Sequence, residues 1–134
     1  MATSKGKQFE LKVRQDLSKI LGISLDRLTD SMSGYKHISN ISDLIFYKYP
    51  FICYCELKSH KGNTFPLTNL TQYEKLIAKK GIKGVRAGVV LWFRDHDKVL
   101  WVPIETFERL KKEDKKSVNV KMDYDEYNII DLPS

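Results

Sequence analysis

The sequence predicts a mixed α+β (α/β) fold, in which helices flank a central mixed sheet, and three observations support this class. Two neighbouring runs, 43–49 and 51–58, are rich in Ile, Phe, Tyr and Leu, which favour strands. A third run, 85–93, is apolar almost throughout, as in a central strand buried on both faces. Apolar residues at helical spacing before, between and after these runs predict the flanking helices.

The first third of the chain is expected to be helical and then irregular. A helix is predicted over about 7–21, where apolar residues recur every three or four positions, and Gly22 is suited to end it. A short second helix is expected over 23–32. The segment 31–40 is polar and turn-like, and Gly34 can adopt a positive φ there.

The second half of the chain is expected to alternate between helices and strands. Thr68 or Asn69 can cap a helix that ends at about Lys80, before Gly81. Pro103 suits the start of another helix. The expected elements are a loop at 59–63, the helix to about 80, strands at 85–93 and 98–102, a turn at 94–97, a helix at 104–112, and a tail, 117–134, with a short strand and packing by Tyr124, Tyr127, Ile129 and Ile130.

Length and composition indicate one globular domain, 1–134, that is large enough to bury a core. No run approaches the ~20 apolar residues of a membrane span, and the first residues lack the apolar segment of a signal peptide, so a cytoplasmic location is expected. The net charge of +6 favours a polyanionic partner such as nucleic acid, although a basic protein without such a partner is the plain alternative.

The two strand-rich runs around Pro50 predict a hairpin that carries acidic residues. Positions 43 and 56 are equidistant from a turn at Tyr49-Pro50, so Asp43 and Glu56 are expected to lie opposite each other. Lys58 lies two residues after Glu56 and therefore shares its face. Residues expected on the opposite, core-facing side are Leu44, Phe46, Cys53, Cys55 and Leu57, the two cysteines being reduced thiols.

Two carboxylates this close repel each other unless a cation lies between them. A hard cation such as Mg²⁺ prefers carboxylate and carbonyl oxygens, with water and substrate phosphate completing its coordination. Asp43, Glu56 and Lys58 would then form a plausible site for phosphodiester hydrolysis, in which the lysine assists the attacking water. Judged by their spacing alone, these residues would more often form a solvated cross-strand salt bridge than a nuclease site. Their position on strongly apolar strands favours the nuclease site.

Asp95, His96 and Asp97 also look like metal ligands, but we interpret them as a turn because Asp favours turns. His37 is a weak candidate for a general base, since no spacing connects it to Asp43.

Asp43 with Glu56-Leu57-Lys58 resembles the PD-(D/E)xK nuclease signature. The longer pattern resembles the RecU family of Holliday junction resolvases, in a compact version like those of phages. Its residues are Lys5-Gly6-Lys7, Glu10, Glu56-Leu57-Lys58-Ser59, Thr64-Phe65-Pro66-Leu67, Asn69 and Gln72. Ser42 stands where that family usually has proline, and the segment 22–41, which matches the protruding stalk of RecU proteins, is short.

The resemblance implies a restriction-endonuclease-like core and a Mg²⁺-dependent endodeoxyribonuclease, for which Mn²⁺ may substitute. It implies that Asp43, Glu56 and the Leu57 carbonyl bind the metal, and that Glu10 and Gln72 support catalysis. Branched DNA and a symmetric homodimer are the expected partners, because a four-way junction needs paired cuts.

Several basic residues are candidates for contacts with DNA: Lys5, Lys7, Lys36, His60 and Lys61. Each of them could equally be an ordinary solvated residue of a helix or loop. Two alternatives to a junction resolvase stay open, namely a related nuclease that acts on other DNA structures and a DNA-binding module without catalysis. A structural interaction protein is a third class, and it predicts no salt-sensitive affinity for DNA.

Overall fold

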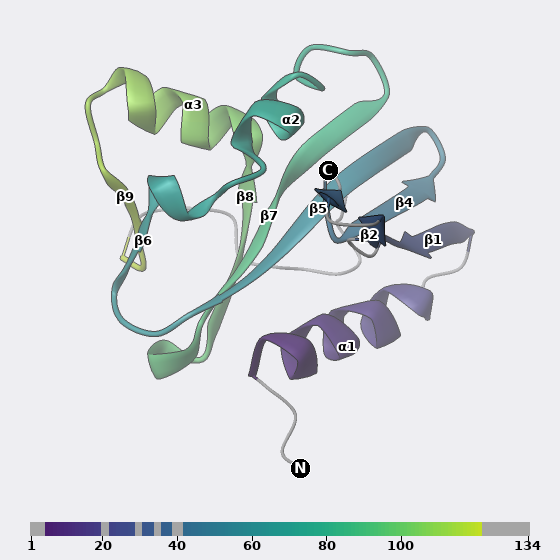
Figure 1. Ribbon diagram of the computed structural model, residues 1–134, viewed down its shortest axis with the longest axis horizontal. Helices are drawn as coiled ribbons and strands as arrows, with labels where there is room; N and C mark the ends of the chain where they lie inside the picture. Colours follow the sequence, from purple (N-terminus) through teal and green to yellow (C-terminus); the bar gives the residue numbers. More distant parts are fainter. Residues whose placement is uncertain (1–4, 20–21, 29–30, 34–35, 39–41, 122–134) are drawn as a thin grey trace.

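The computed structural model describes residues 5–19, 22–28, 31–33, 36–38 and 42–121 of the 134-residue chain. Its centre is a five-stranded mixed sheet in the order β1-β4-β5-β7-β8 (Figure 1). In chain order, the elements are α1 (Lys5–Ser18), β1 (Ile23–Arg27), β2 (Ser31–Ser33), β3 (Lys36–Ile38), β4 (Leu44–Lys48), β5 (Phe51–His60), β6 (Thr64–Pro66), the 3₁₀ turn η1 (Leu67–Asn69), α2 (Tyr73–Ile77), β7 (Val85–Phe93), the 3₁₀ turn η2 (Arg94–His96), β8 (Lys98–Pro103), α3 (Ile104–Lys112) and β9 (Ser117–Asn119).

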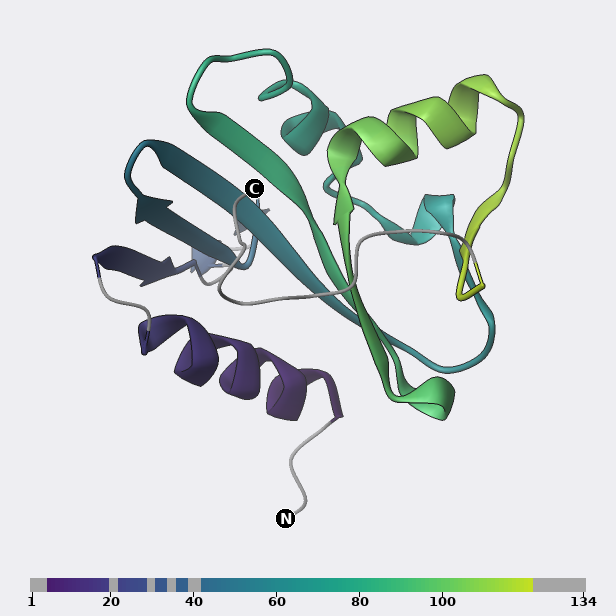
Figure 2. The same cartoon turned by 180° about the vertical axis from the view of Figure 1, so that it is seen from behind.

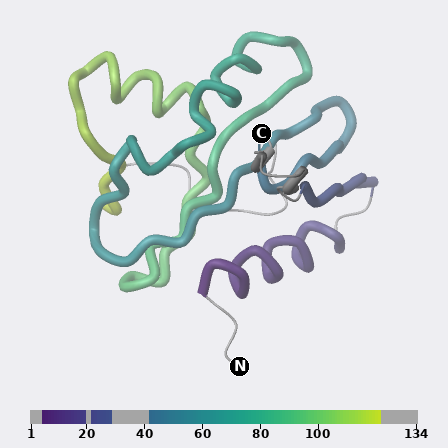
Figure 3. The backbone as a smooth tube through the Cα atoms, viewed as in Figure 1, coloured from purple at the N-terminus to yellow at the C-terminus, as the bar shows by residue number. Residues whose placement is uncertain are grey.

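The sheet combines three antiparallel pairs with one parallel pair. β1 pairs with β4, β4 with β5, and β7 with β8 in antiparallel fashion, whereas β5 and β7 run parallel. A parallel pair needs a crossover, and here the crossover contains β6, η1 and α2 (Figure 3). Two small ribbons, β2–β3 and β6–β9, lie outside the central sheet.

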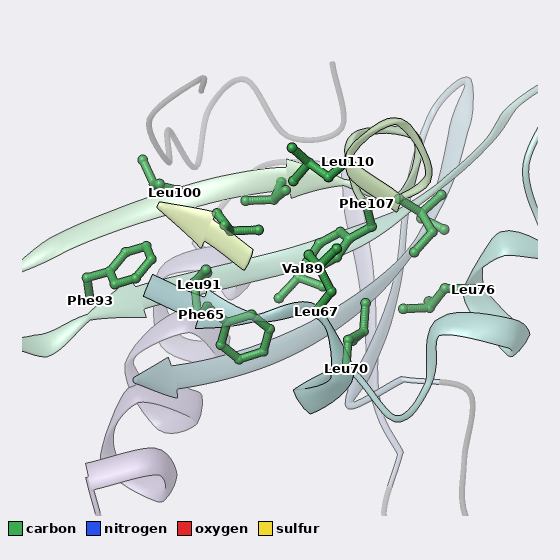
Figure 4. Packing of buried hydrophobic residues seen from close by; sticks show 14 of the residues in the cluster. Phe65, Leu67, Leu70, Leu76, Val89, Leu91, Phe93, Leu100, Phe107 and Leu110 are labelled. Atoms are coloured by element: carbon green, nitrogen blue, oxygen red, sulfur yellow. The ribbon is translucent and has the colours of Figure 1, made fainter. Parts of the chain in front are cut away.

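Each face of the sheet has its own apolar cluster (Figures 1 and 2). On one face α1 buries Phe9, Val13 and Leu17 against the residues predicted to face the core, which are Leu44, Phe46, Cys53, Cys55 and Leu57. On the other face, the side chains of α3, η1 and β7 gather around Val89 and Phe107 (Figure 4). The helices therefore flank the sheet on both sides, as the sequence predicted.

The expected short helix over 23–32 is wrong. Residues Ile23–Arg27 form β1, an edge strand that pairs with β4 from Ile23↔Lys48 to Arg27↔Leu44. Ile23 and Leu25 alternate with exposed residues and pack against the cluster under α1, which is the period of a strand. The segment expected to be turn-like contains the β2–β3 ribbon, in which Ser31 pairs with Ile38.

The expected helix from residue 68 or 69 to 80 is much shorter than predicted. Leu67–Asn69 form a 3₁₀ turn, and the chain leaves the helical conformation at Leu70 (φ −88°, ψ 87°) before α2 begins at Tyr73. This bent path lets Leu67, Leu70 and Leu76 enter the same apolar cluster.

The elements after residue 84 agree closely with expectation. The strands at 85–93 and 98–103, the helix at 104–112 and a short strand at 117–119 are all present, and β9 pairs with β6. The tail residues Tyr124, Tyr127, Ile129 and Ile130 lie outside the described residues. No helix in the described parts of the chain is long and apolar enough to cross a membrane.

Gly88 allows close packing between β7 and β8, and Gly88→Ala is expected to destabilise the protein by about 1–3 kcal/mol. A Cβ at this position would lie 2.7 Å from both Trp101 Cη2 and the Val102 carbonyl oxygen, and 3.0 Å from Pro103 Cα. The free energy of unfolding in urea would measure the loss. Gly6→Ala is the control, because its Cβ would meet nothing within 4 Å and alanine favours a helix. Equal stability of the two variants would contradict the prediction.

Candidate functional site

The hairpin of β4 and β5 has the predicted register. The pairs run from Leu44↔Cys55 to Lys48↔Phe51, so one further step places Asp43 opposite Glu56. The turn lies at Tyr49-Pro50, whose peptide bond is cis. Directly opposite residues share a face of a sheet, and Lys58 lies on that face as well. The hairpin therefore brings two carboxylates and one amine together, as the sequence suggested.

Asp43 directly precedes β4 and is held in place through both its main chain and its side chain. Its Oδ2 accepts a hydrogen bond from the Leu57 N–H (2.9 Å), and its carbonyl oxygen accepts one from the Leu28 N–H (2.8 Å). The buried Ser42 hydroxyl donates to the Leu44 carbonyl oxygen (2.8 Å). Asp43 is thus fixed between β1 and β5, with its carboxylate turned toward the strand that carries Glu56.

Glu56 is almost completely buried, with 2% of its surface exposed, whereas Lys58 is half-buried. Both lie on the face covered by α2 and α3, because Tyr54, two residues before Glu56, packs against that cluster. Burying a carboxylate is costly unless a cation or hydrogen-bond donors compensate it. A buried acid beside a second acid is therefore a favourable place for a cation.

The thiols of Cys53 and Cys55, on the neighbouring positions of β5, are affected by burial and by nearby charged residues. Burial raises the pKa of Cys55 well above its usual value, and the nearby Cys53, Glu56 and Asp43 raise it further. Burial likewise raises the pKa of Cys53, against the opposing effect of the Arg86 guanidinium. Both cysteines are free, as predicted, and neither thiol is ionised near neutral pH.

The donors at the hairpin fit a hard cation that keeps part of its water shell. Among the residues that the structure describes, no group of three or more His, Cys, Asp or Glu side chains could hold a metal ion. A metal at the hairpin would have two carboxylates, those of Asp43 and Glu56, and the Leu57 carbonyl as a third protein oxygen. An all-oxygen set completed by water and a substrate phosphate is what Mg²⁺ prefers.

Glu10 and Gln72 lie on opposite sides of the sheet, on α1 and at the start of α2. Glu10 Oε1 accepts a hydrogen bond from Arg27 Nε (2.8 Å), and Arg27 pairs with Leu44 beside Asp43. Gln72 was expected within the first turn of a helix that begins after residue 68 or 69, but it directly precedes α2, and its Oε1 accepts a hydrogen bond from Thr71 Oγ1 (3.0 Å). Helix α2 has only five residues, so its dipole adds little to the binding of a phosphate near Gln72.

The predicted DNA contacts differ in how they are placed. Lys5 and Lys7 are exposed at the start of α1, and Lys61 is exposed in the loop after β5. Lys36 belongs to β3, and its side chain lies outside the described part of the structure. The His60 ring packs edge-on against Phe65 and Phe93, with centroids 5.5 and 6.2 Å away, so it belongs partly to the apolar cluster.

The turn at 94–97 has a structural function that the sequence did not reveal. Asp95 Oδ2 accepts a hydrogen bond from the Gly62 N–H (3.1 Å), and His96 Nε2 lies 2.6 Å from Asn63 Oδ1. Asp97 Oδ1 accepts a hydrogen bond from Trp92 Nε1 (3.1 Å). These contacts support the interpretation as a turn, and they hold the loop that follows Lys58 and His60. Nothing in the linear sequence connects this turn with Asn63.

Comparison with known proteins supports the fold. No family model matches the chain, and no curated protein matches its sequence. The structure is similar to that of Hjc, a Holliday junction resolvase from the archaeal hyperthermophile Archaeoglobus fulgidus, with a TM-score of 0.57 and 19% sequence identity over 75% of this chain and 78% of that chain. The predicted restriction-endonuclease-like core is confirmed. Because this neighbour is an Hjc protein, resemblance to RecU in particular stays a prediction.

Proposed function

We propose that this chain is a single nuclease domain that cleaves branched DNA by metal-dependent phosphodiester hydrolysis, with four-way junctions as its substrate. The observation that carries the proposal is the β4–β5 register, which continued by one residue places Asp43 opposite the buried Glu56, in a fold similar to that of a Holliday junction resolvase. The charge of +6 suits a polyanionic substrate. A cytoplasmic location would be compatible with a DNA substrate.

Each hairpin residue has a chemical function in this proposal. Asp43 and Glu56, with the Leu57 carbonyl, would hold Mg²⁺ or Mn²⁺, which when bound polarises the phosphoryl oxygen and lowers the pKa of water. The Leu57 N–H orients the Asp43 carboxylate. Lys58 would orient the attacking water or neutralise the charge that develops on the phosphate.

The residues around the hairpin would act indirectly. The Arg27 guanidinium orients Glu10, which would adjust the charge near the start of β4. Gln72 would position a water molecule or a phosphate oxygen. Lys5, Lys7, Lys36 and Lys61 would contact the phosphate backbone, while His60 would support the strand from the apolar side. A symmetric homodimer would place two such sites for paired cuts across a junction with two-fold symmetry.

Cleavage of a synthetic four-way junction, measured beside a linear duplex of matched sequence, tests the proposal. In Mg²⁺ or Mn²⁺ the wild type is expected to make paired, symmetric nicks near the branch point, and EDTA is expected to abolish them. Equal cutting of both substrates would instead indicate a related nuclease without junction selectivity. Tight junction binding without cutting in either metal would indicate a non-catalytic DNA-binding module.

A further inference from the structure

A strip of apolar side chains continues the β4–β5 hairpin from the two acids of the candidate site toward the turn. Its cross-strand pairs are Ile45↔Tyr54 and then Tyr47↔Ile52. Because alternate residues of a strand share a face, these side chains lie on the face that carries the two acids. Two residues span about 7 Å along a strand, so the Tyr47 level lies about 13 Å from the acids. We call these residues the hairpin strip: Ile45, Tyr47, Ile52 and Tyr54.

The hairpin strip is open on its β4 side. On this face α2 and α3 contact β7, and α3 also contacts β8 (Figure 1). Tyr54 packs against the cluster beneath these helices, whereas Tyr47 is 44% exposed and Ile45 and Ile52 are half-buried. In the part of the chain that the structure describes, an aromatic ring and two branched apolar side chains therefore form an accessible surface beside the candidate site.

A cation is held on the same face by the other ring of the strip. Lys79 follows α2, and its Nζ lies 4.8 Å from the centroid of the Tyr54 ring. This cation–π contact orients the ammonium group before a ligand binds, which lowers the entropic cost of binding. Tyr54 lies two residues before Glu56 on β5, and Lys58 lies two residues after it. A lysine is therefore available on either side of Glu56 along this strand.

The charges are distributed unevenly across the strip. Asp26 of β1 is exposed and pairs with Ile45, so its carboxylate lies on the same face but on the far side of β4. A phosphate would be attracted toward Lys79 and repelled from Asp26. A nucleic acid strand would therefore lie with its backbone along β5 and its bases toward β4, where the ring of Tyr47 is exposed.

This arrangement suits unpaired bases better than an intact duplex. Aromatic side chains on an open sheet stack on bases that are splayed out of a helix, while basic residues follow the backbone. The bases of a duplex are stacked on one another and paired, so each must leave the helix before it can reach such a ring. Unpairing costs least where a base is mismatched or already single-stranded, so branched DNA supplies such a base more readily than a linear duplex.

We infer that the hairpin strip binds an unpaired base near the cleaved phosphate, with Tyr47 stacked on the base and Lys79 in contact with the backbone. The inference rests on the proposed nuclease function and deepens it, because it specifies the substrate class. That class is branched DNA with unpaired nucleotides at the branch point. Ile45 and Ile52 would form the apolar surface on which the edge of the base rests.

The test measures DNA affinity without cleavage. Asp43→Asn protein in EDTA would be titrated against labelled DNAs of matched sequence, namely a junction with unpaired thymines at the branch point, a fully paired junction and a linear duplex. In this background, Tyr47→Ala is expected to lower affinity for the junction with unpaired thymines by about tenfold, because one stacked base contributes roughly that much, and to keep the affinity for duplex. Tyr47→Phe retains the ring and is expected to bind like its parent.

Salt dependence separates the stacking contact from the backbone contact. Tyr47→Ala removes no charge, so it should keep the slope of log affinity against log salt. Lys79→Ala is expected to lower this slope by about one, whereas Lys116→Ala, at an exposed position after α3, should keep it. Leu11→Ala is the control for the loss of an exposed apolar side chain, because Leu11 is 46% exposed and lies on α1, across the sheet. A thermal melt establishes that each variant is folded.

Unchanged affinity of Tyr47→Ala for the junctions, or an equal loss for junction and duplex, would overturn the inference. An equal loss in Leu11→Ala, or an unchanged salt slope in Lys79→Ala, would do the same. If sedimentation showed a dimer that Tyr47→Ala dissociates, the strip would instead be an interface between two copies of the chain.

Because the test does not require catalysis, its failure differs from the failure of the proposed function. If the wild type cleaves no DNA but Tyr47→Ala selectively loses affinity for the junction with unpaired thymines, the strip stands as a binding site and the nuclease function fails. If the wild type cleaves junctions and Tyr47→Ala binds them like its parent, only the strip fails.

Discussion

Asp43→Asn is expected to lower the rate of DNA cleavage by roughly a thousandfold while the protein remains folded. Asparagine can still accept the hydrogen bond that the Leu57 N–H donates to Asp43 Oδ2, so the start of β4 stays connected to β5. The substitution removes one of two carboxylates for the metal, and a bound metal contributes several kcal/mol to the transition state, where each 1.36 kcal/mol is about tenfold in rate. Single-turnover cleavage of a four-way junction in Mg²⁺ would measure the effect.

Two further variants separate chemistry from folding. Asp43→Ala loses the charge and the hydrogen bond, so we expect the same loss of cleavage and a further loss of about 1–3 kcal/mol in the free energy of unfolding. Asp97→Asn is the matched control, because it also replaces one carboxylate by an amide, its amide oxygen can still accept the Trp92 Nε1 hydrogen bond, and Asp97 is not one of the proposed metal ligands. Cleavage by Asp43→Asn at the wild-type rate would show that Asp43 has only a structural role, which is to connect the start of β4 to β5.

The hairpin was predictable because its information is local. Pro50 marks the turn, the apolar residues alternate on both sides of it, and the register of Asp43 and Glu56 follows from counting outward. The same holds for the helix 104–112, which follows Pro103 directly. In these segments the spacing of the apolar residues and the residues at the turns indicate the same structure, so the local sequence is sufficient to predict it.

The elements that were missed depend on partners distant in the chain. β1 has only five residues, and its strand conformation depends on pairing with β4, about 20 residues later. β6 pairs with β9 from Thr64↔Asn119, across more than 50 residues. Because β1 was not predicted as a strand, the ion pair between Arg27 and Glu10 could not be foreseen either.

Lys58→Ala is expected to lower the cleavage rate by about a hundredfold and to leave junction affinity in EDTA nearly unchanged. Lys58 is half-buried on the face of Glu56. Its ammonium could act on the attacking water or on the cleaved phosphate there, but it could contact few other phosphates of the DNA backbone. Lys58→Arg should recover only part of the rate, because the planar guanidinium cannot replace a compact ammonium. The cleavage rate at saturating enzyme and the dissociation constant in EDTA would measure the two effects separately.

Lys116→Ala removes an equal charge from an exposed position after α3, and we expect it to cleave like the wild type. A loss of affinity without a loss of rate in Lys58→Ala would reassign this lysine to DNA binding. If wild type and Lys58→Ala bound junctions equally and neither cut them in Mg²⁺ or Mn²⁺, the chain would be a binding module. The buried Glu56 would then be a structural acid whose charge is compensated by the protein itself, and the hairpin would carry the nuclease pattern without its chemistry.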